Sequence, residues 1–193
     1  MLRLFVALEL PPAARAALAG FQAELKQAVG PAARDVKWVD PLSVHLTLQF
    51  LGAVPEERLA ELEAALRAAA SGARPLELKL SGSGAFPSPS RPRVLWAGVA
   101  GDLEPLGALV KDLGARLAPL GYPPEERPFS PHLTLGRARD PRGARGLAPA
   151  LTGVPPLAGD PWRCEEATLF RSHLSRSGAR YEPISRARLG PSR

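Results

Sequence analysis

The sequence predicts an α+β protein of two similar lobes, each a mostly antiparallel sheet backed by helices. Two observations predict this architecture. Segments with the two-residue hydrophobic period of strands alternate with segments of helical period, and the connections between them are short. One tetrapeptide, His-Leu-Thr-Leu, occurs in each half of the chain, at 45–48 and at 132–135. We therefore expect residues 1–193 to form a single bilobal domain.

The first half of the chain contains the clearest helix signals. The first helix is expected to begin at Pro12, because proline is favoured in a first turn, and its apolar residues recur at helical spacing as far as Val29. A second helix is expected after Pro55, where Glu56 and Glu57 suit the positive end of a helix. The predicted strands are 2–10, 36–39, 44–51 and 76–80, and the predicted helices are 12–29 and 55–71.

The second half begins with a stretch of loop composition. Residues 81–93 hold four Ser, three Pro and two Gly, so we expect a loop that joins the lobes or closes over a cleft. Asp102 is predicted to cap a helix that ends at Gly121. Strands are predicted over 94–99, 132–136 and 162–170, at most a short helix near 143–151, and a frayed tail over 185–193.

The composition narrows the classes of function. The net charge is +6, and 21 of the 25 cationic residues are Arg, which binds phosphate through two parallel hydrogen bonds. The Arg excess, the absence of Asn and the single Met favour a thermophilic source, and a GC-rich genome is the alternative that gives the same bias. Cys164 is the only cysteine, so we expect a reducing, cytoplasmic setting. Because no stretch reaches about 18 apolar residues and Glu9 interrupts the N-terminal apolar run, we expect neither a membrane span nor a signal peptide.

The repeated tetrapeptide places an imidazole and a hydroxyl on one face of each strand. Residues two apart in a strand point to the same side, so His45 shares a face with Thr47, and His132 shares a face with Thr134. The leucines of each copy point to the opposite face and anchor it to the core. One copy alone would be an ordinary pair in a half-exposed strand. Two identical copies, in a chain with three histidines, predict a paired site.

Two imidazoles and two hydroxyls that face each other suit in-line attack on phosphorus. One group must accept a proton from the nucleophile and another must give one to the leaving group, and histidine does either near its unperturbed pKa of about 6.5. The hydroxyls can donate hydrogen bonds to the non-bridging oxygens. The residues alone leave the two histidines equivalent. They also leave two alternatives: a non-catalytic RNA-binding module, or a phosphodiesterase acting on an ADP-ribose cyclic phosphate or a 2′-5′ oligonucleotide.

No metal and no cofactor are expected. A catalytic metal site usually has about three protein ligands, and the sequence holds neither a His-x-x-x-His pair nor a histidine clustered with acids. The glycine patterns of phosphate-binding loops and dinucleotide-binding folds are also missing from the sequence.

The two tetrapeptides resemble the His-x-Thr/Ser-x signature of the 2H phosphoesterase superfamily. From Arg3 to about Tyr181 the chain is similar to the bacterial and archaeal RNA 2′,3′-cyclic phosphodiesterases, also called 2′-5′ RNA ligases. Besides the motifs, the similar segments are 37–39, 49–52, 91–96, 131–137 and 172–181.

The resemblance implies a bilobal fold with an active-site groove between the lobes. It also implies hydrolysis of RNA or nucleoside 2′,3′-cyclic phosphates to 2′-phosphates, and a reverse 2′-5′ ligation that needs no ATP. In that scheme His45 is the proton donor to the leaving 3′ oxygen, His132 is the proton acceptor that activates water, and Thr47 and Thr134 bind the phosphate. RNA ends are then the expected partner, and no protein partner is implied.

Four further residues are candidate substrate contacts. Simple alternation places Arg137 on the leucine face, but a bulge at Gly136 would turn it toward the site. Phe5 and Phe129 either stack on a base or pack in the core, and Tyr181 is a candidate for closing the groove.

Other charged and polar residues carry open interpretations. Arg139, Arg142 and Arg145 either follow an RNA backbone or lie in a solvated loop. His173 opens a similar tetrapeptide in a different context, so we expect a surface-loop histidine with a structural role.

Overall fold

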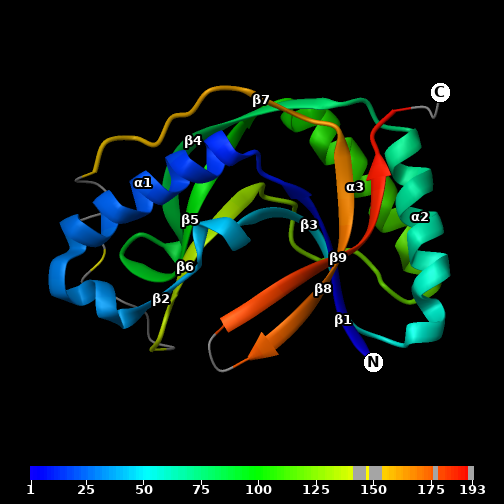
Figure 1. Cartoon of the computed structure of the whole chain (residues 1–193), viewed down its shortest axis with the longest axis horizontal. Coiled ribbons are helices and arrows are strands. Elements are labelled where there is room, and N and C mark those ends of the chain that lie inside the picture. Colours follow the sequence, from blue (N-terminus) through cyan, green and yellow to red (C-terminus); the bar gives the residue numbers. More distant parts are fainter. Residues whose placement is uncertain (141–146, 148–153, 176–177, 191–193) are drawn as a thin grey trace.

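Two antiparallel sheets form the centre of the molecule in the computed structural model, which describes residues 1–140, 147, 154–175 and 178–190 (Figure 1). The four-stranded sheet has the order β3-β1-β8-β9, and the five-stranded sheet has the order β2-β6-β5-β4-β7. The strands are β1 Leu2–Glu9, β2 Val36–Trp38, β3 His45–Val54, β4 Leu76–Ser88, β5 Arg91–Gly101, β6 His132–Ala138, β7 Trp162–Cys164, β8 Glu166–Ser175 and β9 Gly178–Arg188. The predicted α+β architecture of two sheets backed by helices is confirmed.

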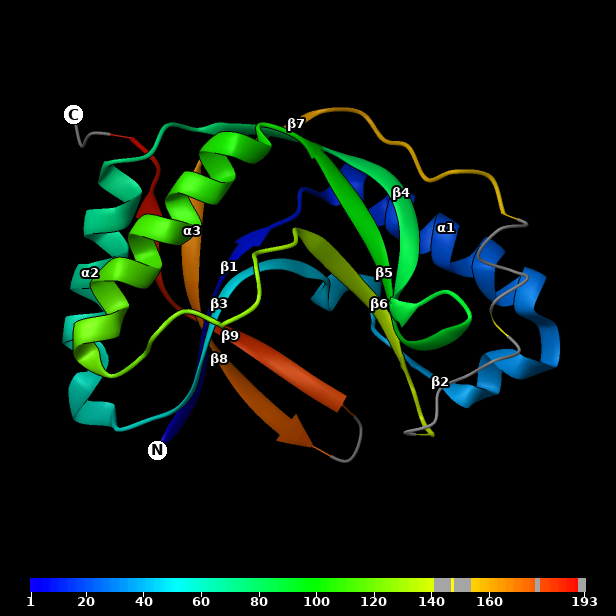
Figure 2. The ribbon, with the colours of Figure 1, turned by 180° about the vertical axis from the view of Figure 1, so that it is seen from behind.

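In the described part of the chain, three α-helices cover the outer faces of the sheets: α1 Pro12–Val29, α2 Leu59–Ser71 and α3 Leu103–Leu117. Helix α1 lies over the five-stranded sheet, whereas α2 and α3 pack against each other and cover the four-stranded sheet (Figures 1 and 2). Each helix buries one apolar stripe at helical spacing. In α3 the buried stripe is Leu106, Leu109, Leu113 and Leu117.

Strand β1 is paired on both edges inside the four-stranded sheet, and side chains on both of its faces are buried. One face carries alternate apolar residues from Leu2 to Leu8 into the main core. The other face carries Phe5 and Ala7, which form a small separate cluster with Phe170 of β8. This second cluster lies beneath the first motif, so β1 supports the core and the candidate site at once.

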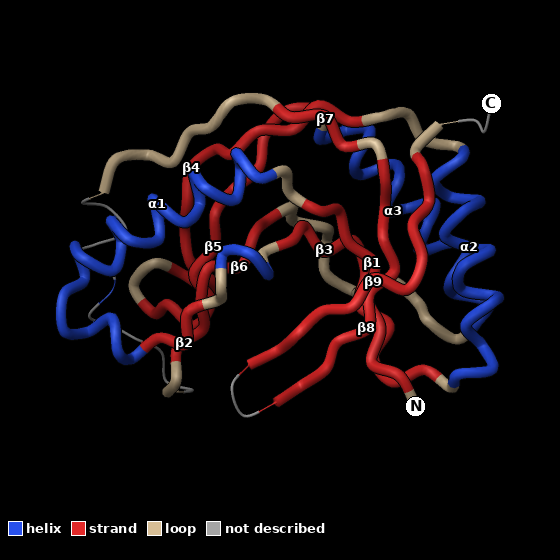
Figure 3. Tube along the Cα trace, viewed as in Figure 1, coloured by secondary structure: helices blue, strands red, loops and turns tan. Residues whose placement is uncertain are grey.

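The two lobes are not consecutive halves of the chain. The chain leaves β1 to form α1 and β2 on the five-stranded side, returns for β3 and α2, and crosses again for β4 and β5. Figure 3 shows the strands at the centre and the hairpin of β8 and β9 projecting beside them. Hydrophobic period reveals each element but not which distant strand it pairs with, so the sequence did not predict these crossings.

Two expectations about segments of loop or tail composition are wrong. Residues 81–93 are not a loop between lobes, because β4 continues to Ser88 and pairs with β5. The small residues of this segment allow β4 and β5 to pair. Gly84 lies opposite Trp96, and a Cβ at that position would clash with the indole ring. Residues 185–188 are not frayed but complete β9, and Leu189 is buried.

The predicted strand over 162–170 is divided into β7 and β8, which belong to different sheets. Asp102 does precede α3, yet its carboxylate does not cap the helix. It accepts hydrogen bonds from Arg74 and from the Glu77 N–H, and the guanidinium of Arg74 is the main reason that its pKa falls to about 2. The predicted short helix near 143–151 lies almost entirely outside the described residues.

Candidate active site

The two tetrapeptides open β3 and β6 with the predicted alternation. The leucines of both copies are buried in the main core, and the His and Thr side chains are half-buried on the opposite face. β3 and β6 belong to different sheets but lie side by side (Figure 2). The fold therefore brings together two strands that carry the same four residues.

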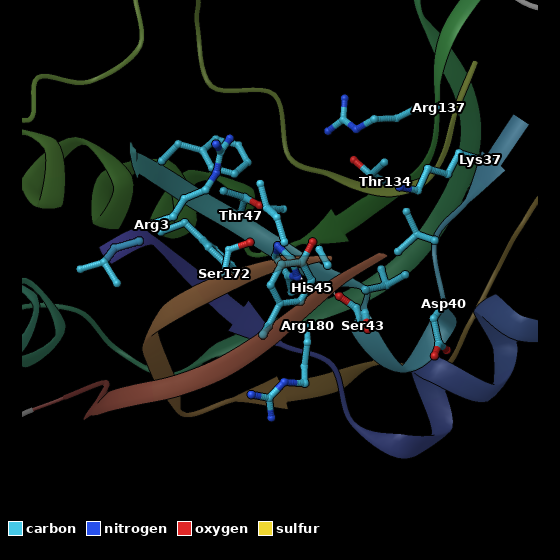
Figure 4. Close-up of a pocket in the computed structure, with 18 of the residues that line it drawn as sticks. Arg3, Lys37, Asp40, Ser43, His45, Thr47, Thr134, Arg137, Ser172 and Arg180 are labelled. Carbon is cyan, nitrogen blue, oxygen red and sulfur yellow. Dashed lines mark hydrogen bonds between the residues drawn. The ribbon is translucent and has the colours of Figure 1, made fainter. Parts of the chain in front are cut away.

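A cavity of about 630 Å³ opens where the two strands meet. His45 and Thr47 line it from β3, and Thr134 lines it from β6 (Figure 4). His132 is not one of the residues lining the cavity itself. It lies two residues before Thr134 on the same face of β6, at the point where that strand begins.

His45 rests on an aromatic cluster. The Phe5 ring stacks on the imidazole with centroids 4.6 Å apart, and the Tyr181 ring meets it edge-on at 4.9 Å. Burial in this cluster lowers the pKa of His45 below 6.5, and the hydrogen bond to the Ser43 carbonyl only partly opposes the shift. Burial also raises the pKa of Tyr181, against the charge of Arg137.

His132 has a similar but more open support. The Phe86 ring of β4 meets its imidazole edge-on at 5.1 Å, and Trp96 of β5 packs on Phe86 with centroids 5.4 Å apart. Trp96 pairs across the strands with Thr134, so it lies on the same face as the motif. Each histidine thus has an aromatic neighbour from another strand of its own sheet.

Both imidazoles are oriented by the same backbone contact. The Nδ1 of His45 lies 2.9 Å from the carbonyl oxygen of Ser43, and the Nδ1 of His132 lies 2.7 Å from that of Ser130. A carbonyl can only accept, so Nδ1 carries a proton in each ring. Nε2 is then the atom in each histidine that is left to exchange a proton.

Each motif is followed by a β-bulge at the same position. On β3, Thr47 pairs with Ala7 and Gln49 with Val6, so Leu48 between them has no partner across the strands. On β6, Leu135 is skipped in the same way in the pairing with β5. A bulge reverses the alternation that follows it.

Counted from the motif histidine, the sixth residue of each strand is turned to the cavity face by the bulge. That residue is Phe50 after the first motif and Arg137 after the second, and both line the cavity. The predicted turning of Arg137 by a bulge is therefore confirmed, but the residue without a partner is Leu135 and not Gly136, which pairs with Leu95. The buried Gln22 of α1 holds this bulge, because its Nε2 donates to the Leu135 carbonyl at 3.0 Å and to the Val39 carbonyl at 2.8 Å.

The charged residues that line the cavity are mainly cations. One acid, Asp40, is among its described lining residues, and one of its oxygens accepts a hydrogen bond from the Leu42 N–H. The basic lining residues come from four strands, as Figure 4 shows: Arg3, Lys37, Arg137 and Arg180. Such a lining favours an anionic ligand.

The structure places the other residues that were predicted to contact the substrate in different surroundings. Tyr181 and Phe5 both line the cavity. Phe5 is only 3% exposed, however, and its ring is stacked between His45 and Phe170, so neither of its faces is free for a base. Phe129 packs against the main core and is not among the cavity-lining residues. Arg139 donates to the Arg34 carbonyl at 2.9 Å. Arg142 and Arg145 lie outside the described residues.

His173 is not in a loop but on β8, where its Nε2 lies 2.6 Å from a carboxylate oxygen of Glu182 on β9. This hydrogen bond is the main reason that the pKa of Glu182 is lowered. The partner across the hairpin gives His173 a structural contact, in keeping with the predicted role.

Several cavity residues were missed from sequence. Phe50 is the clearest case: regular alternation from Thr47 would bury it, and no glycine at 49 or 50 signals the bulge. The others come from strands far apart in the chain, so local patterns do not connect them to the motifs: Arg3, Lys37, Ser172, Leu174 and Arg180.

Neither a metal cluster nor a membrane helix occurs in the part of the chain that is described. Within it, no three His, Cys, Asp or Glu side chains are grouped so that they could hold a metal ion. None of its helices is long and apolar enough to cross a membrane.

Comparison with known proteins gives one consistent family. Residues 8–96 and 100–181 match the family described as LigT like Phosphoesterase. An RNA 2′,3′-cyclic phosphodiesterase of Methanothermobacter thermautotrophicus is 34% identical over 187 residues, which cover 97% of this chain and 98% of that protein. A protein of the same name from Thermus thermophilus is 35% identical over 190 residues, covering 96% and 89%.

Solved structures show the same architecture. TT0787 of Thermus thermophilus superimposes with a TM-score of 0.81 at 32% identity, covering 99% of this chain and 100% of that one. E. coli LigT in its apo form gives a TM-score of 0.77 at 28% identity, covering 98% of both chains. The two-lobed arrangement of this chain is therefore the arrangement of these proteins.

Proposed function

Because this chain belongs to the LigT-like phosphoesterase family, we propose that it hydrolyses the 2′,3′-cyclic phosphate ends of RNA to 2′-phosphates. Residues 1–193 act in this proposal as one bilobal phosphodiesterase domain. The observation that carries it is the pair of His-x-Thr motifs on the adjacent strands β3 and β6, which meet at a cavity lined by four basic side chains. A cyclic phosphate is an anion whose hydrolysis needs the acid, base and hydrogen-bond donors that these motifs carry.

In the proposed mechanism the two Nε2 atoms exchange protons on opposite sides of phosphorus. His132 accepts a proton from water as the water oxygen bonds to phosphorus. The bond from phosphorus to the 3′ oxygen breaks, and His45 gives its proton to that oxygen. Thr47 and Thr134 donate hydrogen bonds to the non-bridging oxygens, whose charge Arg137 offsets.

The lowered pKa of His45 requires that substrate binding restore its proton. In the free protein, burial favours the neutral imidazole. An anionic phosphate beside the ring favours the charged form and raises the pKa again. Protonation of the general acid is thereby coupled to the arrival of the substrate.

The same residues support the reverse reaction. A ribose 5′-hydroxyl in place of water attacks the cyclic phosphate, loses its proton to His132, and displaces the 3′ oxygen. The product is a 2′-5′ phosphodiester, and no ATP is consumed because the energy of the cyclic ester is retained in the new bond.

The direct test is turnover of 2′,3′-cyclic AMP in the presence of EDTA, with separation of adenosine 2′-phosphate from adenosine 3′-phosphate. We expect the 2′-phosphate as the product. His45→Ala and His132→Ala should each lower kcat by about 10²- to 10⁴-fold. His173→Ala is the matched control, because it removes the third histidine, whose partner is Glu182, and should leave kcat within about twofold.

Three results would count against the proposal: a strict need for added metal, release of the 3′-phosphate, or equal activity in all three variants. Salt-sensitive RNA binding without turnover would identify a non-catalytic RNA-binding module. Turnover of an ADP-ribose cyclic phosphate or a 2′-5′ oligonucleotide, but not of the RNA end, would identify a different substrate for the same four residues.

A further inference from the structure

An acidic residue lies opposite the histidine of the first motif, whereas a glycine lies opposite that of the second. Glu9, the last residue of β1, pairs with His45 across the strands, so the two side chains share the cavity face of the sheet. Gly98 of β5 holds the corresponding position opposite His132. A Cβ on Gly98 would run into the carbonyl oxygen of Ser81, so no acidic side chain fits there. The two halves of the site therefore differ in the charge beside the imidazole.

The Glu9 carboxylate is held by three side chains. Its Oε1 accepts hydrogen bonds from the Thr168 hydroxyl at 3.4 Å and from Nη2 and Nε of Arg186 at 3.2 and 3.3 Å. Its Oε2 lies 3.6 Å from Nη2 of Arg15 on α1. None of these four residues is among the described residues that line the cavity. They are therefore placed to act on His45 without touching a bound ligand.

Arg15 occupies a position that does little for the stability of the fold. It lies in the first turn of α1, at the positive end of the helix dipole, where a cation is unfavourable. Its Nε is buried and has no hydrogen-bond partner among the described residues, and an unsatisfied buried donor costs free energy. Its ion pair with Glu9 is partly exposed, and such a pair stabilises a protein little. Stability alone therefore does not explain a cation here.

Glu9 and Arg15 act on His45 with opposite signs. Burial is the main reason that the pKa of His45 is lowered; the positive charge of Arg15 lowers it further, and the negative charge of Glu9 raises it. The other charged or titratable side chains on the elements around His45 lie on the cavity wall and on β9: Lys37, Asp40, Arg137, Arg180, Tyr181 and Arg186.

We propose that Glu9 and Arg15 are a positioning pair that sets the charge of His45, with Glu9 keeping the proton on the imidazole that must donate it. The inference rests on the proposed function, in which His45 gives its proton to the 3′ oxygen. A neutral imidazole whose proton is on Nδ1 has no proton on Nε2 to give, so the general acid works only as the imidazolium. Arg15 opposes Glu9, so that the acid is not too weak to release its proton. The pair distinguishes two histidines that the repeated motif leaves equivalent.

The experiment measures the titration of His45 in the free protein, by NMR of the imidazole resonances. Glu9→Gln and Arg15→Met break the same ion pair, yet they should move the midpoint in opposite directions, downward in Glu9→Gln and upward in Arg15→Met. Arg15→Lys keeps the charge and should keep the midpoint of the wild type. Glu63→Gln is the matched control, because it removes an acid from an ion pair of 3.5 Å with Arg67 on α2, and it should leave the midpoint unchanged.

Two substrates show whether the pair acts through the proton of His45. On 2′,3′-cyclic AMP at about pH 8, Glu9→Gln should lower kcat/KM by about 3- to 30-fold, because a smaller fraction of His45 carries a proton. The second substrate is the 2′-O,3′-S-cyclic phosphorothiolate of adenosine, whose sulfur leaves without a proton because a thiol has a pKa of about 8.5. On this substrate Glu9→Gln should stay within about twofold of the wild type.

Midpoints that move in the same direction in Glu9→Gln and Arg15→Met, or that do not move, would overturn the proposal. Equal losses of Glu9→Gln on both substrates would also overturn it. Should Glu9→Gln fail to fold, Arg15→Met still decides, since a raised midpoint supports the pair and an unmoved or lowered one contradicts it.

The NMR titration needs no turnover, which keeps this test separate from the proposed function. Opposite shifts in a protein that hydrolyses no cyclic phosphate would leave the pair standing and refute the proposed function. Turnover by the wild type, with unmoved midpoints in both variants, would refute the pair and leave the proposed function standing.

Discussion

The Phe5 ring of β1 lies directly beneath the imidazole of His45, with centroids 4.6 Å apart and planes inclined by only 28°. One residue thus belongs both to the packing of the four-stranded sheet and to the surroundings of the imidazole that lines the cavity. Its ring fills the space between His45 and Phe170 and removes water from one side of the imidazole.

Replacement of Phe5 should therefore reduce stability. Phe5→Ala should lower the free energy of unfolding by about 3–5 kcal/mol, because a buried aromatic ring is lost and a cavity remains. Urea unfolding of the purified protein measures this loss. Phe50→Ala, the same substitution at a ring that is 55% exposed, is the control and should cost about 1 kcal/mol or less. Equal losses in the two variants would contradict the assignment of Phe5 to the packed cluster.

The titration of His45 should show the effect of its burial. In the free protein its midpoint should lie below 6.5, because burial disfavours the imidazolium. Inorganic phosphate should raise that midpoint by placing a negative charge beside the ring. NMR of the imidazole resonances over pH 4–9, with and without phosphate, measures both (about 6.5 is the reference for an unperturbed ring). A midpoint at or above 6.5 without phosphate would contradict the prediction.

The lowered pKa of His45 should also make the stability of the protein depend on pH. A folded-state pKa below that of the unfolded chain means that the folded protein binds fewer protons, so stability rises with pH through this range. The stability that depends on a neutral His45 is fully present above about pH 6.5. This part of the free energy of unfolding is lost as the pH falls toward the folded-state pKa.

The roles of the two histidines should separate when the leaving atom is changed. In a 2′-O,3′-S-cyclic phosphorothiolate the leaving atom is sulfur, which departs without a proton because a thiol has a pKa of about 8.5. His45→Ala should then recover to within about tenfold of the wild type, while His132→Ala should remain about 10²-fold or more impaired. The measurement is kcat/KM on the sulfur and oxygen substrates. Recovery of His132→Ala in place of His45→Ala would reverse the assignment.

The buried Gln22 should be needed to hold the second bulge. Gln22→Met keeps the length of the side chain but removes the donor to the carbonyl oxygens of Val39 and Leu135. It should lower the free energy of unfolding by about 1–3 kcal/mol, and it should raise KM for cyclic AMP by displacing Arg137. Gln27→Met, the same substitution on the exposed side of α1, is the matched control. An unchanged KM in a destabilised Gln22→Met would limit the role of Gln22 to packing.

Most of the local structure, and the faces of the motif residues at the centre of the site, could be predicted from the sequence. Apolar alternation predicted the strands of both motifs, and the helical stripe from Leu106 to Leu117 predicted α3. The faces of His45 and Thr134 followed from the two-residue period alone. These features depend on near neighbours in the chain, which a single sequence displays.

What the sequence did not show depends on pairing between distant segments. Residues 81–88 have loop composition, yet they form a strand because β5 pairs with them and their small side chains admit Trp96. Ser185 belongs to a strand because β9 pairs with β8. Phe50 reaches the cavity only through a bulge, which the partner strand defines. The turning of Arg137 was anticipated because Gly136 lies next to its bulge.

The repeated crossing of the chain between the lobes also bears on their motion. Several covalent connections run in parallel between the two sheets, where many two-lobed enzymes have a single linker that bends. Rotation of one lobe against the other would strain all these connections together. In the proposed mechanism the hydroxyls of Thr47 and Thr134 are accordingly held in register before a ligand arrives, so that little reorganisation energy is spent when charge develops on the phosphate.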